Sequence, residues 1–580
     1  MSSGADRARR LAPLVPVAAL LVAGAACPAL PPRRPVPPPV HAVVGANVRV
    51  TGDRSGSYAA AEGKSDAVTR GCGNARLPQN EPTVAVDPRA PNVVVAGAND
   101  LCGLAGGMRG PWVGYYRSVD GGRTWADSLV PGYPGDLAPP GASLPAGADC
   151  TGASDPTVAF DNAGRVFFGF ICFDPKGHNE GLAIVSTWDA DGAHFVGSAL
   201  AGGAPPEGSG GSNEDKIDLT VDRSGGPRDG TVYVAYAQFD EHGDSTIMVT
   251  SSPDHGRSFS APVQASSEIG QFADLSVAPD GDLYLAYRSF TGAFDEGGDE
   301  GGLGGEGEGG DDDRDPIELA RSGDGGATFA PPTTIATGTP FDSEGFSGTT
   351  HRRDCGDGHD ACSSGFTFPR FVSFPAVVAD GTGVHVIWNA ELGSGQSKVF
   401  VRNSADGAHW KSPPVQIDDE TVGHQFFPAI ASAGGILTAA FYDTRSDASY
   451  SPARPPCNTA GGTNPGPCVD VYAAHSADGG RTWTEERVTS ASGNTNWEID
   501  DGFRVPFIGD YIGVAATPGR AIVVWTDSRD IVPGRDPDEH GDRDDHDGFD
   551  VDLASCSLIG RACLFKGGLD QNVYGAALRS

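Results

Sequence analysis

Short runs of apolar residues recur along almost the whole chain, and glycine, proline, aspartate and asparagine separate them. Many runs come in pairs joined by a tight turn, as in PTVAVDPRAPNVVVAG from Pro82 and PTVAFDNAGRVFFGF from Pro156. β-branched and aromatic residues are frequent in these runs, and amphipathic helices are hard to find beyond residue 26. The pattern predicts an all-β protein built from antiparallel strand pairs.

An octapeptide repeat is interleaved with these strand pairs. Seven pairs follow one another, beginning at Pro82, Pro156, Ile217, Ala273, Pro375, Pro428 and Tyr511. The full copies of the octapeptide are SVDGGRTW at 118–125 and SADGGRTW at 476–483, and weaker copies follow the intervening pairs. The central aspartates are Asp120, Asp191, Asp254, Asp324, Asp406 and Asp478. Asp-Gly-Gly favours a tight turn, and repetition at even spacing indicates one structural unit used repeatedly.

Each unit is predicted to contain four strands, with the octapeptide between the third and the fourth. Four-stranded antiparallel units repeated in this way are the blades of a β-propeller. Seven strand pairs predict seven blades, with six as the alternative. In the last blade, VDLASCSL at 551–558 is the expected third strand. The segment ANVRVTGD at 46–53 resembles a fourth strand and is expected to close the ring, which would remove exposed sheet edges.

The charge of the chain restricts its partners. The formal net charge is −35 at pH 7, which argues against nucleic acid as a partner because phosphate binding requires a basic face. Near the N-terminus, Arg7, Arg9 and Arg10 precede an apolar run, Leu11–Ala26, that is too short and proline-interrupted for a good membrane span. We therefore predict a signal peptide over residues 1–27 and a secreted or lipid-anchored, monomeric protein.

The cysteines fit an oxidising compartment. Cys27 follows Gly24-Ala25-Ala26, which resembles a lipoprotein cleavage site with Cys27 as the lipidated residue; loss of Cys27 with the signal peptide is the alternative. The other ten cysteines fall into neighbouring pairs. The predicted disulfides are Cys72 with Cys102, Cys150 with Cys172, Cys355 with Cys362, Cys457 with Cys468, and Cys556 with Cys563. We assign 28–41 to a proline-rich linker, 42–566 to the propeller and 567–580 to a C-terminal tail.

The octapeptide Ser-x-Asp-x-Gly-x-Thr-Trp resembles the Asp-box, or bacterial neuraminidase repeat, of the sialidase superfamily. The resemblance extends over residues 42–566 and implies a divergent, secreted bacterial member. In such a box the aspartate accepts hydrogen bonds from turn amides, and the tryptophan packs between sheets. The motif is therefore expected to build blades and to take no part in catalysis.

Antiparallel geometry predicts which face of the propeller carries a site. The octapeptide turns share a face with the turns between first and second strands, so the site is expected on the opposite face. Long insertions near 291–316, 446–468 and 530–549 fall on this second face. Polar residues also cluster there, at the ends of strands. They include Glu81, Asn99, Asp100, Asp155, Asp174, Gln238, Asp240, Arg288, Arg370, Asn389, Glu391, Asp443, Arg445, Glu498, Asp510, Tyr511, Asp527 and Arg529.

The resemblance implies a chemistry for this face. Sialidases clamp the substrate carboxylate with three arginines, and they use a tyrosine paired with a glutamate as nucleophile and an aspartate as acid/base. The implied substrate-binding candidates are Arg288, Arg370, Arg445 and Arg529, with Asp443 and Asp527. The implied catalytic candidates are Tyr442 or Tyr511, Glu391 or Glu498, and Asp155. The Arg-Ile-Pro motif that opens the first sialidase blade is Gln79-Asn80-Glu81-Pro82 here, so its arginine is missing.

Two other features have alternative interpretations. YDTRSD at 442–447 and TDSRD at 526–530 place Asp-x-Arg at equivalent points of adjacent blades, either as an ion pair holding a loop or as a guanidinium fork for an anionic ligand. The acidic segments 295–315 and 535–550 offer carboxylates to Ca²⁺ but lack the twelve-residue calcium spacing, and solvated disorder is the alternative. No metal ligand set is recognisable and no cofactor is required.

Two functions follow as hypotheses. The first is an exo-glycosidase of exo-α-sialidase type, acting on sialic acid or another acidic glycan of a glycoprotein. The second is a non-catalytic propeller that binds a glycan or a protein at the cell surface, which the missing arginine and the possible anchor at Cys27 favour.

Overall fold

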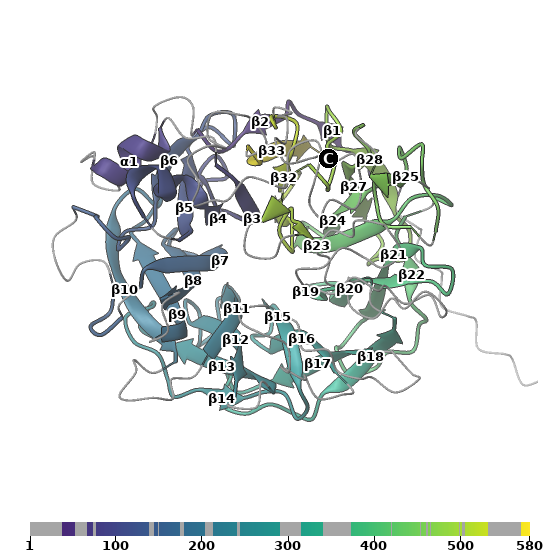
Figure 1. The fold of residues 1–580 in the computed structure, drawn as a ribbon. Coiled ribbons are helices and arrows are strands. Elements are labelled where there is room, and N and C mark those ends of the chain that lie inside the picture. The colour runs from purple at the N-terminus through teal and green to yellow at the C-terminus, as the bar shows by residue number, and fades with distance from the viewer. Residues whose placement is uncertain are drawn as a thin grey trace, which may run out of the picture. The chain divides into compact units, whose positions relative to one another are not determined.

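Seven four-stranded antiparallel sheets stand around a central channel, which confirms the predicted seven-bladed β-propeller (Figure 1). The computed structural model describes residues 38–579 except 53–57, 59–65, 74–76, 109, 138–143, 149, 175–178, 204–212, 241–243, 291–314, 340, 342–372, 419, 453, 460–461, 464–465, 498, 501–504 and 532–569. The described residues belong to the unit Pro38–Ser580. In every blade the first strand lines the channel.

The blades follow one another in chain order. Blade 1 has β3 (Gln79–Val86), β4 (Val94–Asp100), β5 (Trp112–Ser118) and β6 (Ala126–Leu129), and blade 2 has β7 (Gly152–Phe160), β8 (Val166–Asp174), β9 (Asn179–Trp188) and β10 (Phe195–Gly202). Blade 3 has β11 (Asn213–Val221), β12 (Val232–Phe239), β13 (Ser245–Ser252) and β14 (Val263–Gln264), and blade 4 has β15 (Gly270–Val277), β16 (Leu283–Ser289), β17 (Asp315–Ser322) and β18 (Thr333–Gly338). Blade 5 has β19 (Ala376–Asp380), β20 (Gly383–Glu391), β21 (Ser397–Ser404) and β22 (Val415–Gln416), and blade 6 has β23 (Gln425–Ala433), β24 (Ile436–Asp443), β27 (Asp470–Ser476) and β28 (Thr484–Arg487).

Blade 7 is built from both ends of the propeller. Its strands are β31 (Gly513–Thr517), β32 (Arg520–Asp527), β33 (Asn572–Arg579) and the N-terminal β1 (Val43–Val44), with β2 (Val48–Arg49) also paired to β33. The predicted closure by the N-terminal segment is confirmed. The third strand, however, is β33 rather than 551–558, which lies outside the described residues, and β33 had been assigned to a tail. Its small residues, such as Gly575 and Ala576, give it a weak apolar pattern.

The octapeptides lie between third and fourth strands, as expected. In the turn after β5, Asp120 Oδ1 accepts hydrogen bonds from the backbone N–H groups of Arg123 (2.9 Å) and Thr124 (3.0 Å), and Asp120 Oδ2 accepts one from Thr124 Oγ1 (2.7 Å). Trp125, the last residue of this octapeptide, is half-buried against the apolar core of blades 1 and 2. The aspartate thus satisfies turn amides that would otherwise face water, and the tryptophan fastens the turn to a sheet.

Polar side chains on the first strands tie neighbouring blades together. The backbone N–H of Leu275 in β15 donates to Asp218 Oδ2 of β11 (2.8 Å), and the N–H of Ala379 in β19 donates to Ser276 Oγ of β15 (2.9 Å). A first strand is the inner edge of its sheet, so these N–H groups lack a partner strand. Side chains of the preceding blade supply their acceptors.

A few short elements lie outside the blades. They are the helix α1 (Ala67–Cys72), the 3₁₀ helix η1 (Leu101–Gly106) and the hairpins of β25 (Asn458–Thr459) with β26 (Gly462–Thr463) and of β29 (Ile499–Asp500) with β30 (Val505–Pro506). Within the described ranges, neither helix has the length and apolar character needed to cross a membrane.

Candidate functional site

In blades 1 to 6 one residue stands directly before the strand-pair motif, at the end of the channel where the site is predicted, and in blade 7 the corresponding residue is Tyr511, which opens its motif. These seven mouth residues are Glu81, Asp155, Lys216, Phe272, Phe374, Phe427 and Tyr511. In five of them φ is positive, between 45° and 65°, which non-glycine residues rarely adopt. A register shift accompanies each of these five. Each β-bulge interrupts the alternation of side chains between the two faces of the strand and changes the direction in which the side chains point. Such bulges are found often at functional sites.

Blades 1 to 3 supply a charged half of the mouth. Asn99, near the end of β4, donates from Nδ2 to Glu81 Oε2 at 2.7 Å. The backbone N–H of Asp155 donates to Asn99 Oδ1 at 3.0 Å. The backbone N–H of Lys216 in turn donates to Asp155 Oδ2 at 3.1 Å. These hydrogen bonds link two carboxylates and a lysine from three consecutive blades.

Aromatic residues form the other half. The Phe272 and Phe374 rings lie 4.2 Å apart, edge to face, and Phe374 lies 6.4 Å from Tyr511. The Lys216 ammonium reaches across to this half and lies 4.1 Å from the centre of the Tyr511 ring. Phe427 is the exception, because it is buried within blade 6, 5.3 Å from Phe426. The mouth thus places an apolar platform opposite hydrogen-bonding carboxylates.

The ionisation of Tyr511 is strongly perturbed. Burial raises the pKa of its hydroxyl well above the usual 10.0, and the negative charges of Glu81, Asp155 and Asp510 raise it further. A phenol in this setting loses its proton only if a neighbouring base accepts it directly. Glu81 is the first of the neighbouring carboxylates whose charge raises this pKa, which makes it the candidate base for the hydroxyl proton.

The channel continues from the mouth as a cavity of about 320 Å³, and Lys216, Phe272, Phe374 and Tyr511 form its mouth end. Asp218 and Asp274 also line it. Burial raises the pKa of Asp218, and burial together with the charge of Asp218 raises the pKa of Asp274 well above its usual value, while Lys216 opposes both shifts. The pair therefore resists full ionisation.

The two Asp-x-Arg sequences form ion pairs within the blades. Asp443 Oδ2 accepts a hydrogen bond from Arg445 Nε (2.9 Å), and the guanidinium also contacts Glu420 and Glu485 and lies 3.8 Å from the Tyr472 ring. Of the two interpretations of Asp-x-Arg, the structure of this copy fits the ion pair that holds a loop.

The second Asp-x-Arg repeats the arrangement. Arg529 pairs with Asp527 and lies 4.3 Å from the ring of Tyr574, which is on the third strand of blade 7 as Tyr472 is in blade 6. Arg288 pairs with Asp315 and lies over Phe290. The structure thus places these three arginines in ion pairs of their own blades and does not bring them to the mouth residues.

The remaining catalytic candidates are distributed. Tyr442 is buried between blades 6 and 7, and its hydroxyl accepts a hydrogen bond from the Thr526 N–H at 3.0 Å. Glu391 ends β20 and bridges to Thr339 of blade 4. Asp155 and Tyr511 are brought together at the mouth, whereas Arg370 and Glu498 lie outside the described residues.

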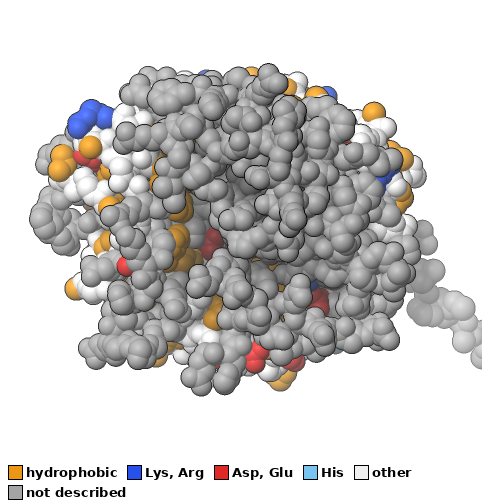
Figure 2. Space-filling view, viewed as in Figure 1, with side chains coloured by type: hydrophobic (Ala, Val, Ile, Leu, Met, Phe, Trp, Pro, Cys, Tyr) orange, Lys and Arg blue, Asp and Glu red, His pale blue; other side chains and the backbone are white. Residues whose placement is uncertain are grey.

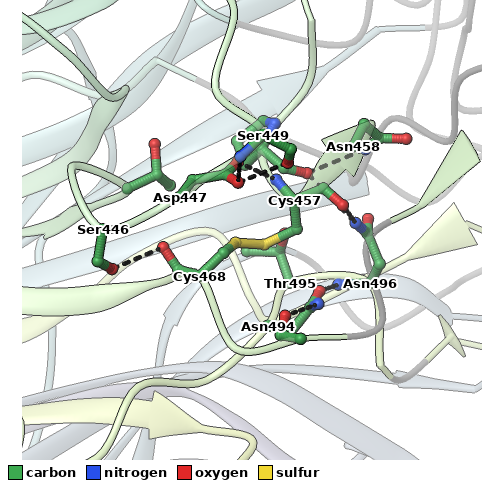
Figure 3. The surroundings of a disulfide bond; sticks show 12 residues. Ser446, Asp447, Ser449, Cys457, Asn458, Cys468, Asn494, Thr495 and Asn496 are labelled. Carbon is green, nitrogen blue, oxygen red and sulfur yellow. Dashed lines mark hydrogen bonds between the residues drawn. A yellow bond between two sulfur atoms is a disulfide. The ribbon is translucent and has the colours of Figure 1, made fainter. Parts of the chain in front are cut away.

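Three predicted disulfides are present, Cys72–Cys102, Cys150–Cys172 and Cys457–Cys468. Figure 3 shows the last of these, which closes the insertion of blade 6. Asp447 Oδ2 accepts from the Cys457 N–H (3.1 Å), and Asn496 Nδ2 donates to the Pro456 carbonyl (3.2 Å), so the insertion is fixed to the following loop.

The other two predicted disulfides differ from these three, because the structure does not show them. Cys355 and Cys362 both lie outside the described residues, and so do Cys556 and Cys563. The pairing of Cys355 with Cys362 and that of Cys556 with Cys563 therefore stay predictions. Cys27, the predicted lipidation site, also lies outside the described residues.

Metal sites were expected to be absent, apart from calcium in the acidic segments. Among the described residues, no group of three or more His, Cys, Asp or Glu side chains is placed to hold a metal ion. Nearly all of 295–315 and the whole of 535–550 lie outside the described residues. Described acidic side chains are nevertheless visible at several points of the face in Figure 2.

No protein-family model matches the chain, and no curated protein matches it in sequence. Solved structures do match. A protein of unknown function from Dyadobacter fermentans is 15% identical, with a TM-score of 0.37 over 64% of this chain and 92% of that one. Penicillium chrysogenum α-L-arabinanase with arabinobiose is 13% identical, with a TM-score of 0.39 over 69% and 94%. Leech intramolecular trans-sialidase is 11% identical, with a TM-score of 0.37 over 63% and 64%.

Sequence reasoning gave no role to Glu81 and overlooked Lys216. Both stand immediately before an aligned strand-pair motif, at Pro82 and Ile217. Extending the first six motifs by one residue, and aligning Tyr511 with the residues so added, would have shown the charged half in blades 1 to 3 and the aromatic half in blades 4 to 7.

Proposed function

We propose that this protein is a carbohydrate-active propeller that hydrolyses a glycosidic bond at the mouth of its channel. The supporting observation is that a charged half, with Glu81 and Asp155, meets an aromatic half that includes Tyr511. Sugars suit such a surface, because their C–H faces pack on aromatic rings while their hydroxyls bond to polar groups. From the signal peptide that the sequence predicts over residues 1–27, we also propose that it acts outside the cytoplasm.

The mouth residues fit the division of labour of a tyrosine-based glycosidase. Tyr511 Oη attacks the anomeric carbon while Glu81 takes its proton, which the raised pKa of Tyr511 requires. Asp155 donates a proton to the departing oxygen. It then accepts a proton from the water that attacks the anomeric carbon, while the bond to Tyr511 Oη breaks and Glu81 returns its proton to that oxygen. This assignment uses the Tyr–Glu pair and the aspartate implied by the sialidase resemblance.

The substrate assignment differs from that resemblance. Arg445 and Arg529 are engaged by carboxylates of their own blades, so they do not support an arginine clamp for sialic acid. Lys216 is the cation at the mouth. We therefore propose a glycan substrate, with an acidic sugar held by Lys216 as one form and a neutral sugar as the other.

The test is hydrolysis of fluorogenic glycosides (a sialoside, a glucuronide and an arabinofuranoside) by the full chain. Tyr511→Phe, Glu81→Gln and Asp155→Asn are each expected to reduce kcat by about a hundredfold or more. Tyr442→Phe is the matched control, since Tyr442 is buried away from the mouth, and it should retain activity. Equal activity in Tyr511→Phe and the parent protein would contradict the assignment.

A second candidate, non-catalytic glycan or protein binding, is favoured by one observation. The Tyr511 hydroxyl is buried and Lys216 lies over its ring, which is the arrangement of a residue that packs the mouth rather than one that reacts. Absence of turnover on all three glycosides by folded protein, together with glycan binding that Phe374→Ala weakens, would establish this alternative.

A further inference from the structure

We propose that Asn99 is a positioning residue that holds Glu81 in its base form and sets it against Asp155. The inference rests on the proposed function, since it assigns what a side chain outside the reacting group does there. Its observation is separate: one amide spans two blades with both of its polar atoms.

The first contact concerns Glu81. Asn99 Nδ2 donates to Glu81 Oε2 at 2.7 Å, and the two side chains are on paired strands of blade 1. Both residues are buried, 8% and 3% exposed, so water competes little for this bond. An N–H donor favours a carboxylate over a carboxylic acid, and the carboxylate is the form that accepts the Tyr511 proton.

The second contact concerns Asp155. Asn99 Oδ1 accepts from the backbone N–H of Asp155 at 3.0 Å, in the bulge where Asp155 has a φ of 55°. The same amide therefore restrains the unusual backbone of blade 2. Asp155 Oδ2 is engaged by the Lys216 N–H of blade 3. Asn99 thus fixes the backbone of Asp155, and the Lys216 N–H of blade 3 orients its carboxylate.

The residue type matters as much as the contacts. An amide is neutral at every pH and presents a donor to one group and an acceptor to the other. An aspartate at position 99 would present two acceptors to Glu81 and add a negative charge to a mouth that already contains Glu81, Asp155 and Asp510. A leucine would fill a similar volume with neither hydrogen bond.

The first experiment follows Glu81 itself. Carboxyl ¹³C spectra of the glutamate-labelled full chain would be recorded against pH, with the Glu81 resonance identified by its loss in Glu81→Gln. In Asn99→Leu the Glu81 midpoint should rise by about one pH unit, and in Asn99→Asp by at least as much. Asn162→Leu, an exposed site where Asn162 bonds to Asp229, should leave it unchanged. An unchanged midpoint in whichever folded variant is obtained would overturn the inference.

The second experiment uses any glycoside that the parent protein cleaves. Asn99→Leu should lower kcat about tenfold or more with little change in KM, and the acid limb of the pH profile should move upward with Glu81. A purely structural role would lower the melting temperature and leave that limb in place, which would count against positioning. If the parent protein cleaves none of the glycosides, the proposed function fails, while the Glu81 titration still decides whether Asn99 controls Glu81.

Discussion

The Lys216 ammonium lies 4.1 Å from the centre of the Tyr511 ring and 5.6 Å from that of Phe374. A cation from blade 3 is thus held over aromatic rings that precede the first strands of blades 5 and 7. The contact spans the channel mouth and connects the charged half with the aromatic half. It is a long-range link that no single blade contains.

Replacing Lys216 by Met should therefore reduce stability. A partly desolvated cation–π contact contributes about 1–2 kcal/mol, so we expect the free energy of unfolding to fall by about 1 kcal/mol. Lys411→Met at an exposed position is the control and should change it little. Urea denaturation measures both, and equal effects of the two substitutions would contradict a specific role for Lys216.

Asp274→Asn should increase stability at neutral and alkaline pH. The folded-state pKa of Asp274 lies above the unfolded value of about 3.9, so its protonated form contributes stability that is fully present below that value. This contribution is lost as pH rises through the folded pKa. The asparagine is always neutral and keeps an acceptor for the Val377 N–H. We expect a gain of about 1 kcal/mol at pH 8 that disappears towards pH 3.

Urea unfolding at both pH values tests this expectation. Asp280→Asn, in an exposed turn, serves as the control. A gain of the same size at both pH values would show that repacking, rather than titration in the channel, causes the effect.

Asp120→Ala should destabilise more than Asp191→Ala. Asp120 accepts hydrogen bonds from two backbone N–H groups of its turn, whereas in the shortened copy the Asp191 carboxylate accepts from the Ala193 N–H. We expect losses of about 1–2 kcal/mol and well under 1 kcal/mol, respectively. Thermal melts of the two variants make the comparison, and equal losses would contradict the ranking.

The same turn predicts a pH dependence. Partial burial opposes ionisation of Asp120, but the hydrogen bonds from Thr124, Ser118 and Arg123 prevail and lower its pKa to about 2. The stability that ionised Asp120 contributes is therefore present above the unfolded value and is lost as pH falls towards 2. The difference in the free energy of unfolding between the parent protein and Asp120→Ala should therefore shrink as pH falls from the unfolded pKa towards 2.

Arg445→Ala should be a stability variant. It leaves Asp443, whose side chain is fully buried, and Glu485, 10% exposed, without their guanidinium partner. Loss of one partner of a buried ion pair costs about 3–5 kcal/mol. Arg321→Ala, which breaks the pair between an exposed Arg321 side chain and the half-buried Asp282, should cost about 0–1 kcal/mol. A soluble, fully stable Arg445→Ala variant would return Arg445 to the list of ligand-binding candidates.

Most of the architecture could be predicted because its signals are local. The octapeptide turn is held by bonds that span four residues, such as that from Thr124 to Asp120, so sequence alone reveals it. The strand β33 was not predicted because it contains several small residues and pairs with Val43 and Val48, which lie more than five hundred residues earlier in the sequence.

The site was harder to predict for the same reason. Asp443 and Arg445 are two residues apart, but Glu420 and Glu485 reach the guanidinium from elsewhere in the chain, and those partners make it structural. The approach of Lys216 to Tyr511 depends on the circular arrangement of the blades. Neither spacing nor composition indicates a contact between residues so distant in the chain.

The pairing of β33 with β1 and β2 determines when the sheet of blade 7 is complete. Val43 pairs with Arg579 and Val48 with Gly575, so β1 and β2 have no partner strand until β33 has been made, after the strands of the other six blades. The sheets of blades 1 to 6 can therefore form before β33 is made, whereas the sheet of blade 7 cannot. Tyr511 belongs to blade 7 and Glu81 to blade 1, so their approach at the mouth depends on the same closure of the ring.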